Sequence, residues 1–428
     1  MKQKALQIYL AGVNSVLPDK LVRTKLLSDS YILSKAENIY VFATGKAAFL
    51  MAKEAEEILG SRITEGLVVT KYEHGGKLKH FKVFEAGHPT PDENGVYATT
   101  QVIQLIGKAN ENDIVICLIS GGSSALLADY PVGSTLKDLK NANEQLINCG
   151  AKISEINCVR KHLSTVKGGQ LAKVIYPATT ISLILSDVVD DQLDVIASGI
   201  TAPDNTTFYD ALEVIKKYNL TESFPSTLIN HLNNGLLGLI AETPKSDDYI
   251  FSKVKNYIIG NNKIALVGAA EKAVELGFDT QIVTDQLEGD YTHVAELILK
   301  TINSKSNISD SNNKPLCLLF GGEPTVNVTG TGKGGRNQHL ALYLAKKINS
   351  NKNITIFCAG TDGTDGPTDA AGAVVDGLTI KHSSENNINY IDYLSNFDSY
   401  NFFNQMGDIV KIGNSGTNVM DIIVVLIC

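Results

Sequence analysis

Short apolar runs alternate with segments of helical spacing along most of the chain. Residues 38–43 form an apolar run that ends in a Thr-Gly-Lys turn, and residues 47–59 then carry apolar side chains at helical spacing. The same order recurs at residues 113–120, which lead into a turn of glycines and serines. A run that is apolar throughout is typical of a strand buried on both faces of a parallel sheet. Strands alternating with helices predict right-handed βαβ crossovers and a doubly wound α/β sheet.

Further apolar runs predict the remaining strands. They lie at residues 66–70, 83–86, 180–185, 256–259, 280–283, 316–320, 353–359 and 422–428. The N-terminus has the spacing of an amphipathic helix that ends at Pro18. The Asn- and Ser-rich stretch at residues 303–314 is predicted as a solvated loop.

The chain of 428 residues is long enough for more than one hydrophobic core. A polar stretch at residues 219–249 contains two prolines and is the best candidate for a linker. We therefore predict a Rossmann-like, doubly wound N-terminal domain over residues 1–240 and a smaller α/β domain over residues 250–428. One option is that the last strand packs back on the first domain.

Composition narrows the class of protein. The formal charge of -8 and the absence of Trp argue against a sequence-independent nucleic-acid surface. The six cysteines lack CxxC spacing, which fits a reducing compartment. The N-terminus lacks the apolar core of a signal peptide, and no run approaches ~18 apolar residues. These features predict a cytoplasmic protein that binds neither nucleic acid nor membrane.

The loop at residues 321–338 carries the strongest candidate chemistry. It follows an apolar strand, precedes a helix and is rich in glycine and hydroxyl side chains, with Lys333 and Arg336 as its cations. Glycines let main-chain N–H groups approach a ligand, and a helix start adds a positive dipole end. The planar guanidinium of Arg336 matches phosphate or carboxylate oxygens. The structural alternative is a flexible surface hairpin.

Comparable turns follow three other predicted strands, where ligands gather in open α/β sheets. Lys46 opens a helix, where a cation opposes the dipole, so it indicates a bound anion or else a solvated lysine. The GxxxxGK[ST] pattern of a P-loop is absent there. Residues 120–124, Ser-Gly-Gly-Ser-Ser, offer N–H groups and hydroxyls for an anion, or serve as an ordinary N-cap.

Carboxylates also occur at the predicted strand ends. Asp187 directly follows an apolar strand, as do the metal-holding carboxylates of phosphoryl-transfer enzymes. Glu323, Asp362 and Asp365 are further candidates for a metal site or a base. His88, in a GHPTP turn, is interpreted as structural or as a substrate contact. Together these residues predict an anionic small substrate, a phosphate-bearing partner and a divalent metal ion.

Ten segments, taken in order, carry a resemblance to a known family. They read GKAA, GHPTPDENG, LISGGSSALL, VRKHLSTVKGGQLA, SDV, ASGITAPDNTTFYDAL, GGEPTV, GKGGRNQHLAL, AGTDGTDGPTDAAGA and GTNVMD. Across nearly its whole length the chain thus resembles the class II glycerate 2-kinases, whose C-terminal part is called the MOFRL domain. The resemblance implies ATP-dependent phosphorylation of D-glycerate to 2-phosphoglycerate with Mg²⁺, in a cleft between the two domains.

The resemblance also implies roles for individual residues. The family's essential lysine and arginine fall on Lys46 and Arg336, and Asp187 is expected to hold Mg²⁺ or to orient the glycerate hydroxyl. A second metal ligand is expected at Asp362. Glycerate contacts are expected at Ser120, Gly121, Gly122, Ser123, Ser124 and Arg160. Nucleotide contacts are expected at Gly321, Gly322, Glu323, Thr325, Lys333 and Asn337. A homodimer is one option for the assembly.

Two rival functions remain open at this point. A hydroxypyruvate or hydroxy-acid reductase is disfavoured because no GxGxxG follows the first strand. A non-catalytic sensor of sugar acids or phosphates would use the same anion cradles without turnover. The density of carboxylates beside the cations favours catalysis, because a sensor needs no metal site.

Overall fold

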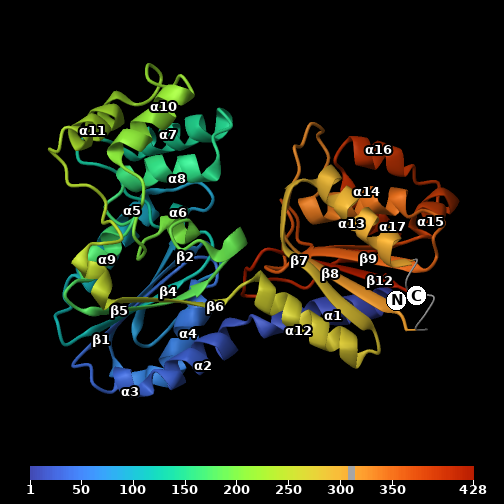
Figure 1. Cartoon of the computed structure of the whole chain (residues 1–428), viewed down its shortest axis with the longest axis horizontal. Coiled ribbons are helices and arrows are strands. Elements are labelled where there is room, and N and C mark those ends of the chain that lie inside the picture. Colours follow the sequence, from blue (N-terminus) through green and yellow to red (C-terminus); the bar gives the residue numbers. More distant parts are fainter. Residues whose placement is uncertain (307–313) are drawn as a thin grey trace. The chain divides into compact units, whose positions relative to one another are not determined.

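The chain folds into two compact units. The computed structural model describes residues 1–306 and 314–428 (Figure 1). One unit comprises Pro18–Ile259, and the other comprises Met1–Leu17 together with Gly260–Cys428. We call them the first and the second unit. Each contains a six-stranded sheet covered by helices, which confirms the predicted α/β class.

The first unit has the strand order of a Rossmann fold, β3-β2-β1-β4-β5-β6. Its strands are β1 (Ile39–Thr44), β2 (Ile63–Lys71), β3 (Phe81–Ala86), β4 (Ile114–Ile119), β5 (Thr179–Leu185) and β6 (Val254–Gly260). The pairs from β3 to β5 are all parallel. The order reverses between β1 and β4, so the predicted doubly wound sheet is confirmed.

Both faces of this sheet are buried, as the apolar runs required. Every residue of β1 and β4 is buried. Helices α2 (Pro18–Ser28) and α4 (Ala48–Leu59) share a core with one face, and α5 (Glu93–Ile106) and α9 (Gln170–Ile175) share a core with the other. Short helices α3 (Ser30–Leu33) and α6 (Ser123–Leu126) and the 3-10 turns η1 (Gly60–Arg62), η2 (Val189–Asp191), η3 (Ile196–Ser198) and η4 (Tyr249–Lys253) complete the unit.

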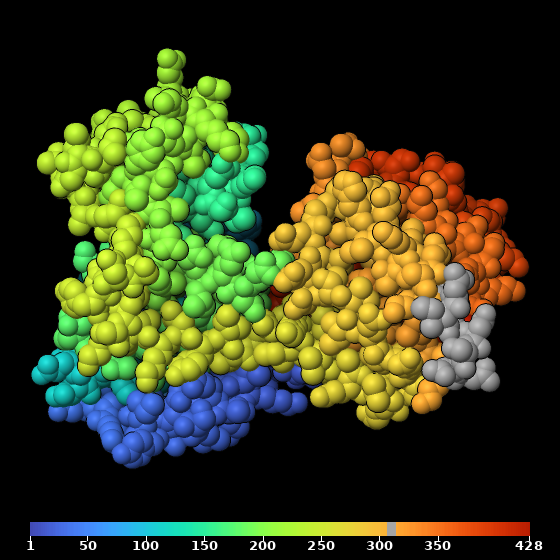
Figure 2. Space-filling model, in the orientation of Figure 1, coloured from blue at the N-terminus to red at the C-terminus, as the bar shows by residue number. Residues whose placement is uncertain are grey.

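Four helices of the first unit form a group with a small core of its own. They are α7 (Leu136–Asn148), α8 (Ile153–His162), α10 (Phe208–Lys217) and α11 (Ser226–Leu236). In Figure 1 they lie together to one side of the sheet, and in Figure 2 they form the green to yellow-green end of that unit. This helical group supplies one wall of the pocket described below.

The second unit has a mixed sheet in the order β11-β10-β9-β12-β8-β7. Its strands are β7 (Asp279–Asp290), β8 (Leu316–Thr325), β9 (Ile354–Gly360), β10 (Gly372–Asp376), β11 (Ile409–Val410) and β12 (Asp421–Ile427). Strand β12 runs antiparallel to both β8 and β9, whereas β7 and β8 are parallel. The helices are α1 (Lys2–Ser15), α12 (Asn262–Glu275), α13 (Tyr291–Ser306), α14 (Arg336–Lys347), α15 (Thr379–Glu385), α16 (Tyr390–Ser395) and α17 (Ser399–Met406).

The unit boundary differs from the predicted one in two places. The polar stretch at residues 219–249 is not a linker, because it contains α11 and belongs to the first unit. Strand β6, expected to open the second domain, instead borders β5 at the edge of the first sheet. The boundary therefore follows Ile259. The polar composition of this stretch suggested a linker because α11 buries only two residues, Leu228 and Leu232.

The two chain ends also differ from expectation. Helix α1, expected in the first domain, belongs to the second unit, where Tyr9 packs on Phe357 of β9 with ring centroids 4.9 Å apart. The last strand, β12, lies between β9 and β8 inside the second unit's own sheet. Of the loop predicted at residues 303–314, residues 303–306 are helical in α13, and residues 307–313 lie outside the described part of the chain.

Candidate active site

In the first unit, the turns after β1 and β4 are tied together at the point where the strand order reverses. The main-chain N–H of Lys46 donates to the carbonyl of Gly121 over 2.9 Å. The N–H of Ala47 donates to Ser120 Oγ over 3.1 Å. Gly45, at φ +113°, makes this approach possible, because a Cβ there would lie 2.2 Å from Ser120 Oγ. The structure thus brings Lys46 and the serine-glycine turn together, as predicted from strand order.

The residues of this turn have different surroundings. Ser120 and Ser123 are buried, and the Ser123 hydroxyl donates to the carbonyl of Ser120 over 2.6 Å. Their hydroxyls therefore hold the turn in shape. Gly122 and Ser124 instead line a pocket. Helix α6, which starts here, has only four residues, so its dipole adds little to the turn.

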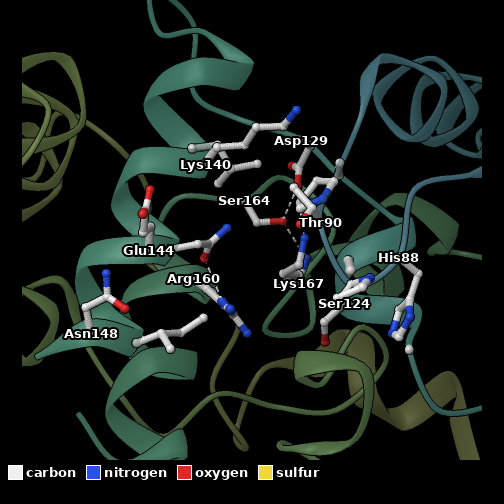
Figure 3. Close-up of a pocket in the computed structure, with 18 residues that line it drawn as sticks. His88, Thr90, Ser124, Asp129, Lys140, Glu144, Asn148, Arg160, Ser164 and Lys167 are labelled. Carbon is white, nitrogen blue, oxygen red and sulfur yellow. Dashed lines mark hydrogen bonds and ion pairs between the residues drawn. The ribbon is translucent and has the colours of Figure 1, made fainter. Parts of the chain in front are cut away.

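The pocket has a volume of about 610 Å³ and lies within the first unit (Figure 3). Its walls come from the turn after β3, the turn after β4, helices α7 and α8, and the segment that follows α8. The lining residues include His88, Thr90, Gly122, Ser124, Asp129, Lys140, Asn143, Glu144, Asn148, Arg160, Ser164 and Lys167. A volume in this range is that of a small-molecule site.

Arg160 is the cation of this pocket best suited to bind a carboxylate. Its Nε donates to Asn143 Oδ1 over 2.8 Å. No Asp or Glu among the described residues forms an ion pair with it. Burial lowers the pKa of Arg160, the effect expected for a cation without a counter-ion. In Figure 3 its guanidinium lies across the pocket from Ser124 and His88. An anionic ligand would supply the missing charge.

A second cation of the pocket, Lys167, is already neutralised. It is buried, and its Nζ donates to Asp129 Oδ1 over 3.2 Å and to the carbonyl of Leu127 over 2.7 Å. Burial lowers the pKa of Lys167, and Asp129 opposes that effect. Asp129 also accepts hydrogen bonds from Ser164 and Thr165. This network fixes the wall of the pocket. No local pattern indicated it, because Lys167 and Asp129 are 38 residues apart in the chain.

The segment after β5 combines a candidate carboxylate with a strained backbone. Asp187 follows the strand directly, and Asp190 and Asp191 then adopt φ of +62° and +52°. Ala197 and Ser198 are also left-handed, at +52° and +54°. Such conformations are costly for non-glycine residues and cluster at functional sites. Here the strain places Ser198 Oγ 2.8 Å from Ser124 Oγ at the pocket wall.

In the second unit, Arg336 lies in an acidic cluster at the start of α14. Its Nε and one terminal nitrogen donate to the two carboxylate oxygens of Asp421, over 2.6 and 3.0 Å. Its other terminal nitrogen donates to Glu323 over 2.5 Å. Burial acts to lower the pKa of Arg336, but the carboxylates of Asp421 and Glu323 raise it overall. Asp421, which begins β12, was missed from sequence because it is distant from both residues.

The glycine-rich loop before α14 is not an open cradle of N–H groups. The N–H groups of Thr331 and Lys333 donate to the side chains of Asn396 and Asp398, and that of Gly332 donates to the carbonyl of Asn396. A Cβ at Gly332 would lie 2.4 Å from Asp398 Cβ. Close packing on residues 396–399 therefore explains why position 332 is a glycine.

The helix start behind the loop is also occupied. Asp365 is buried and accepts hydrogen bonds from the main-chain N–H groups of Asn337 and Gln338, over 3.1 and 2.8 Å. The protein's own carboxylate thus takes the position that we expected for a phosphate.

The other predicted residues of this unit are spread along the same strand ends. Lys333 Nζ lies 4.4 Å from the centre of the Tyr400 ring. Asp362 accepts hydrogen bonds from the N–H and hydroxyl of Thr364. Thr325 is exposed at the end of β8. Gly321 and Gly322 are buried, and a Cβ at Gly322 would lie 2.3 Å from the main chain of Leu287.

Among residues 1–306 and 314–428, no group of three or more His, Cys, Asp or Glu side chains is placed to hold a metal ion. Within the same residues, no helix is long and apolar enough to cross a membrane.

Fold and site together define a class: a two-unit α/β protein with cations and carboxylates at its strand ends and a small-molecule pocket at a topological switch point. Comparison with known proteins makes this more specific. A family described as a domain of unknown function, DUF4147, matches residues 4–233, and the MOFRL family matches residues 316–421. The chain belongs to the glycerate 2-kinase family that combines these two domains.

Full-length relatives support this membership. The chain is 40% identical to the D-glycerate 2-kinase of Thermotoga maritima over 100% of its own length and 98% of the relative's. It is 41% identical to the glycerate 2-kinase of Pyrococcus horikoshii, over 99% and 94% of the two chains. The crystal structure of the Thermotoga maritima glycerate kinase matches with a TM-score of 0.89, covering 100% of this chain and 99% of that one.

Proposed function

We propose that the protein is a D-glycerate 2-kinase that transfers the γ-phosphoryl group of ATP to the 2-hydroxyl of D-glycerate. The observation that carries the proposal is the full-length identity of 40% to a D-glycerate 2-kinase, joined to a pocket in which Arg160 lacks an acidic partner among the described residues. A hydroxy acid of this kind brings the carboxylate that such a guanidinium binds.

The carboxylate of glycerate would bind Arg160, with Ser124 and the turn at Gly122 as neighbouring contacts. Arg160 and Ser124 lie on opposite sides of one pocket (Figure 3), so a ligand between them would touch both. Ser120, Gly121 and Ser123 act indirectly in this proposal, because they shape the turn. Holding the acid by a partly buried cation fixes where its hydroxyl lies, which is the main requirement of phosphoryl transfer.

Lys46 and Arg336 are the cations proposed to act on the transferring phosphoryl group. Fixed positive charges stabilise the charge that spreads over the phosphoryl oxygens in the transition state. For Arg336, contact with phosphate requires an exchange of partners. Glu323 is the partner that can be displaced, because its side chain is 44% exposed, whereas that of Asp421 is 1% exposed.

The nucleotide is proposed to contact the end of β8 and the loop that follows, at Gly321, Gly322, Glu323, Thr325, Lys333 and Asn337. Since the N–H of Asn337 is bonded to Asp365, its contribution would come from the side chain, whose Oδ1 is buried without a partner among the described residues.

Mg²⁺ would be held by Asp187 and Asp362. In phosphoryl-transfer sites this ion takes one or two protein carboxylates and fills its remaining positions with phosphates and water, so the lack of a three-residue cluster is compatible with it. When bound, Mg²⁺ neutralises phosphate charge.

The direct test is ADP release by the purified protein with ATP, Mg²⁺ and D-glycerate, followed by identification of the product by phosphorus NMR. We expect turnover that depends on D-glycerate and yields the 2-phosphate. Oxidation of NADH with hydroxypyruvate, without ADP release, would instead support the reductase. Binding of glycerate without ADP release would support a sensor.

The proposed cations are tested by Lys46→Ala and Arg336→Ala. Each is expected to lower kcat by about 10²- to 10³-fold, because a charge that contacts the phosphoryl group acts mainly in the transition state. Lys20→Ala, at an exposed position of α2, is the matched control. A near-normal kcat for either test variant would contradict the role assigned to that residue.

A further inference from the structure

His88 lines the pocket, and the proposed function assigns it no role in the reaction. It follows β3 by two residues, and its side chain lines the pocket on the same side as Ser124 (Figure 3). Gly122 lines the same pocket. His88 therefore lies at the end of a strand on the same side of the pocket as the turn after β4, and opposite Arg160.

The imidazole of His88 and the side chain of Lys46 both lie close to Gly122. A Cβ built on Gly122 would lie 3.0 Å from both Nε2 and Cδ2 of His88 and 3.4 Å from Cγ of Lys46. Gly122 also has φ +90°, which disfavours any other residue. The absence of a side chain thus lets the ring and the lysine stem approach the same face of the turn.

The ring of His88 has hydrogen-bonding capacity left for a ligand. No hydrogen bond joins it to any of the described residues. The charged or titratable groups that face it are Lys46, Lys71 and His74, all of which disfavour a second positive charge. Burial first, and then these cations, lower the pKa of His88 to about 4. At neutral pH the imidazole is therefore uncharged, with one N–H and one nitrogen lone pair.

We infer that His88 contacts the hydroxy acid and accepts the hydrogen bond of the hydroxyl that receives the phosphoryl group. This inference rests on the proposed function. With the carboxylate on Arg160 across the pocket, a hydroxyl bonded to His88 is directed toward Lys46. Of the two roles expected for Asp187, this arrangement keeps only that of metal ligand.

The proton has a defined path in this arrangement. The hydroxyl oxygen forms a bond to the γ-phosphorus as the bond from that phosphorus to the β,γ-bridging oxygen breaks, and ADP leaves with that electron pair. The hydroxyl proton passes to the lone pair of His88 and afterwards to water. A weakly basic imidazole suffices, because the hydroxyl becomes a strong acid once its oxygen bonds to phosphorus.

The test compares His88→Ala and His88→Gln with Glu93→Ala, a control at an exposed position at the start of α5 that does not line the pocket. Kinetics are measured by ADP release with saturating ATP and varied D-glycerate, and folding by thermal unfolding. We expect His88→Ala to lower kcat by about 10²-fold or more with a smaller change in KM, the size usual for loss of a proton acceptor. His88→Gln keeps a hydrogen-bond acceptor and should recover part of kcat, whereas Glu93→Ala should match the wild type.

The outcomes separate this inference from the proposed function. If the wild type releases ADP with D-glycerate and His88→Ala keeps its kcat, the kinase stands and the role of His88 is wrong. An equal loss in Glu93→Ala, or a loss in His88→Ala confined to KM, also overturns it. If the wild type does not phosphorylate D-glycerate, the proposed function fails and the inference fails with it.

Discussion

At the scale of single residues, charge partners decide what each predicted site residue can do. Arg160 and Arg336 are both candidate site residues from the sequence, and only their neighbours in the fold distinguish them. Arg160 has no acidic partner among the described residues, whereas Arg336 is bonded to two carboxylates. The first is ready to bind an anion, and the second must exchange a partner to do so. Residue type alone does not distinguish these two states.

Asp365 provides a prediction for pH dependence. Burial, followed by the nearby Asp421, raises its pKa to about 7 despite the hydrogen bonds from Gln338 and Asn337. The folded state therefore holds this proton more tightly than the unfolded chain, and the stability that it contributes is full below about pH 4 and lost as pH rises through 7. Between pH 5 and pH 8, the free energy of unfolding of the wild type should fall by on the order of 2 kcal/mol relative to that of Asp365→Asn.

The measurement is the free energy of unfolding in urea at both pH values. Asp369→Asn is the control, because Asp369 lies in the same segment and the pKa of its carboxyl is lowered, first by Tyr400 and Lys411. A difference between wild type and Asp365→Asn that stays constant with pH would contradict the assignment.

At the scale of elements, the first unit depends on the contact between the turns after β1 and β4. Gly45→Ala should destabilise this unit by about 3 kcal/mol or more, because its Cβ would overlap Ser120 in a backbone conformation reserved for glycine. Gly150→Ala is a matched control: φ there is also positive, at +74°, but no atom lies within 4 Å of the added Cβ. It should cost about 1 kcal/mol.

Urea unfolding measures both variants, and ADP release shows whether the turn still works. Equal stability losses at the two positions would mean that backbone conformation alone matters and that the contact with Ser120 does not.

At the scale of the whole molecule, the chain's first helix belongs with residues that follow it by more than 240 positions. Tyr9 of α1 is fully buried, packs on Phe357 and donates its hydroxyl to the carbonyl of Gly360 over 2.7 Å. Tyr9→Ala should therefore destabilise the second unit by about 3 to 5 kcal/mol. Tyr31→Ala, at a position that is 71% exposed in the first unit, should change stability little.

Hydrogen exchange followed by mass spectrometry locates the effect. Faster exchange is expected in residues 260–428 of Tyr9→Ala, with residues 18–259 unchanged. Faster exchange confined to residues 18–259 would contradict the assignment of α1 to the second unit.

Much of the fold was predictable because a parallel sheet imposes a simple pattern. The buried runs at β1, β4 and β5 and the helices between them follow from apolar periodicity, and Rossmann order placed the turns at Lys46 and Ser120 at one sheet edge. Strands β10 and β11 were not predicted, since β11 has only two residues. Site roles remain predictions, but Asp421, Asp129 and Lys167 could not be proposed at all, because each gains its surroundings from segments distant in sequence.

The sequence by itself determined the α/β class, the position of the glycine turns at strand ends and the family, since these depend on local periodicity and on ordered motifs. Only the tertiary structure decided which unit holds α1 and β6, which glycines serve packing, and which cations retain an unmatched charge. The physical reason is that burial and ion pairing are properties of side chains brought together across the fold, and no local pattern records them.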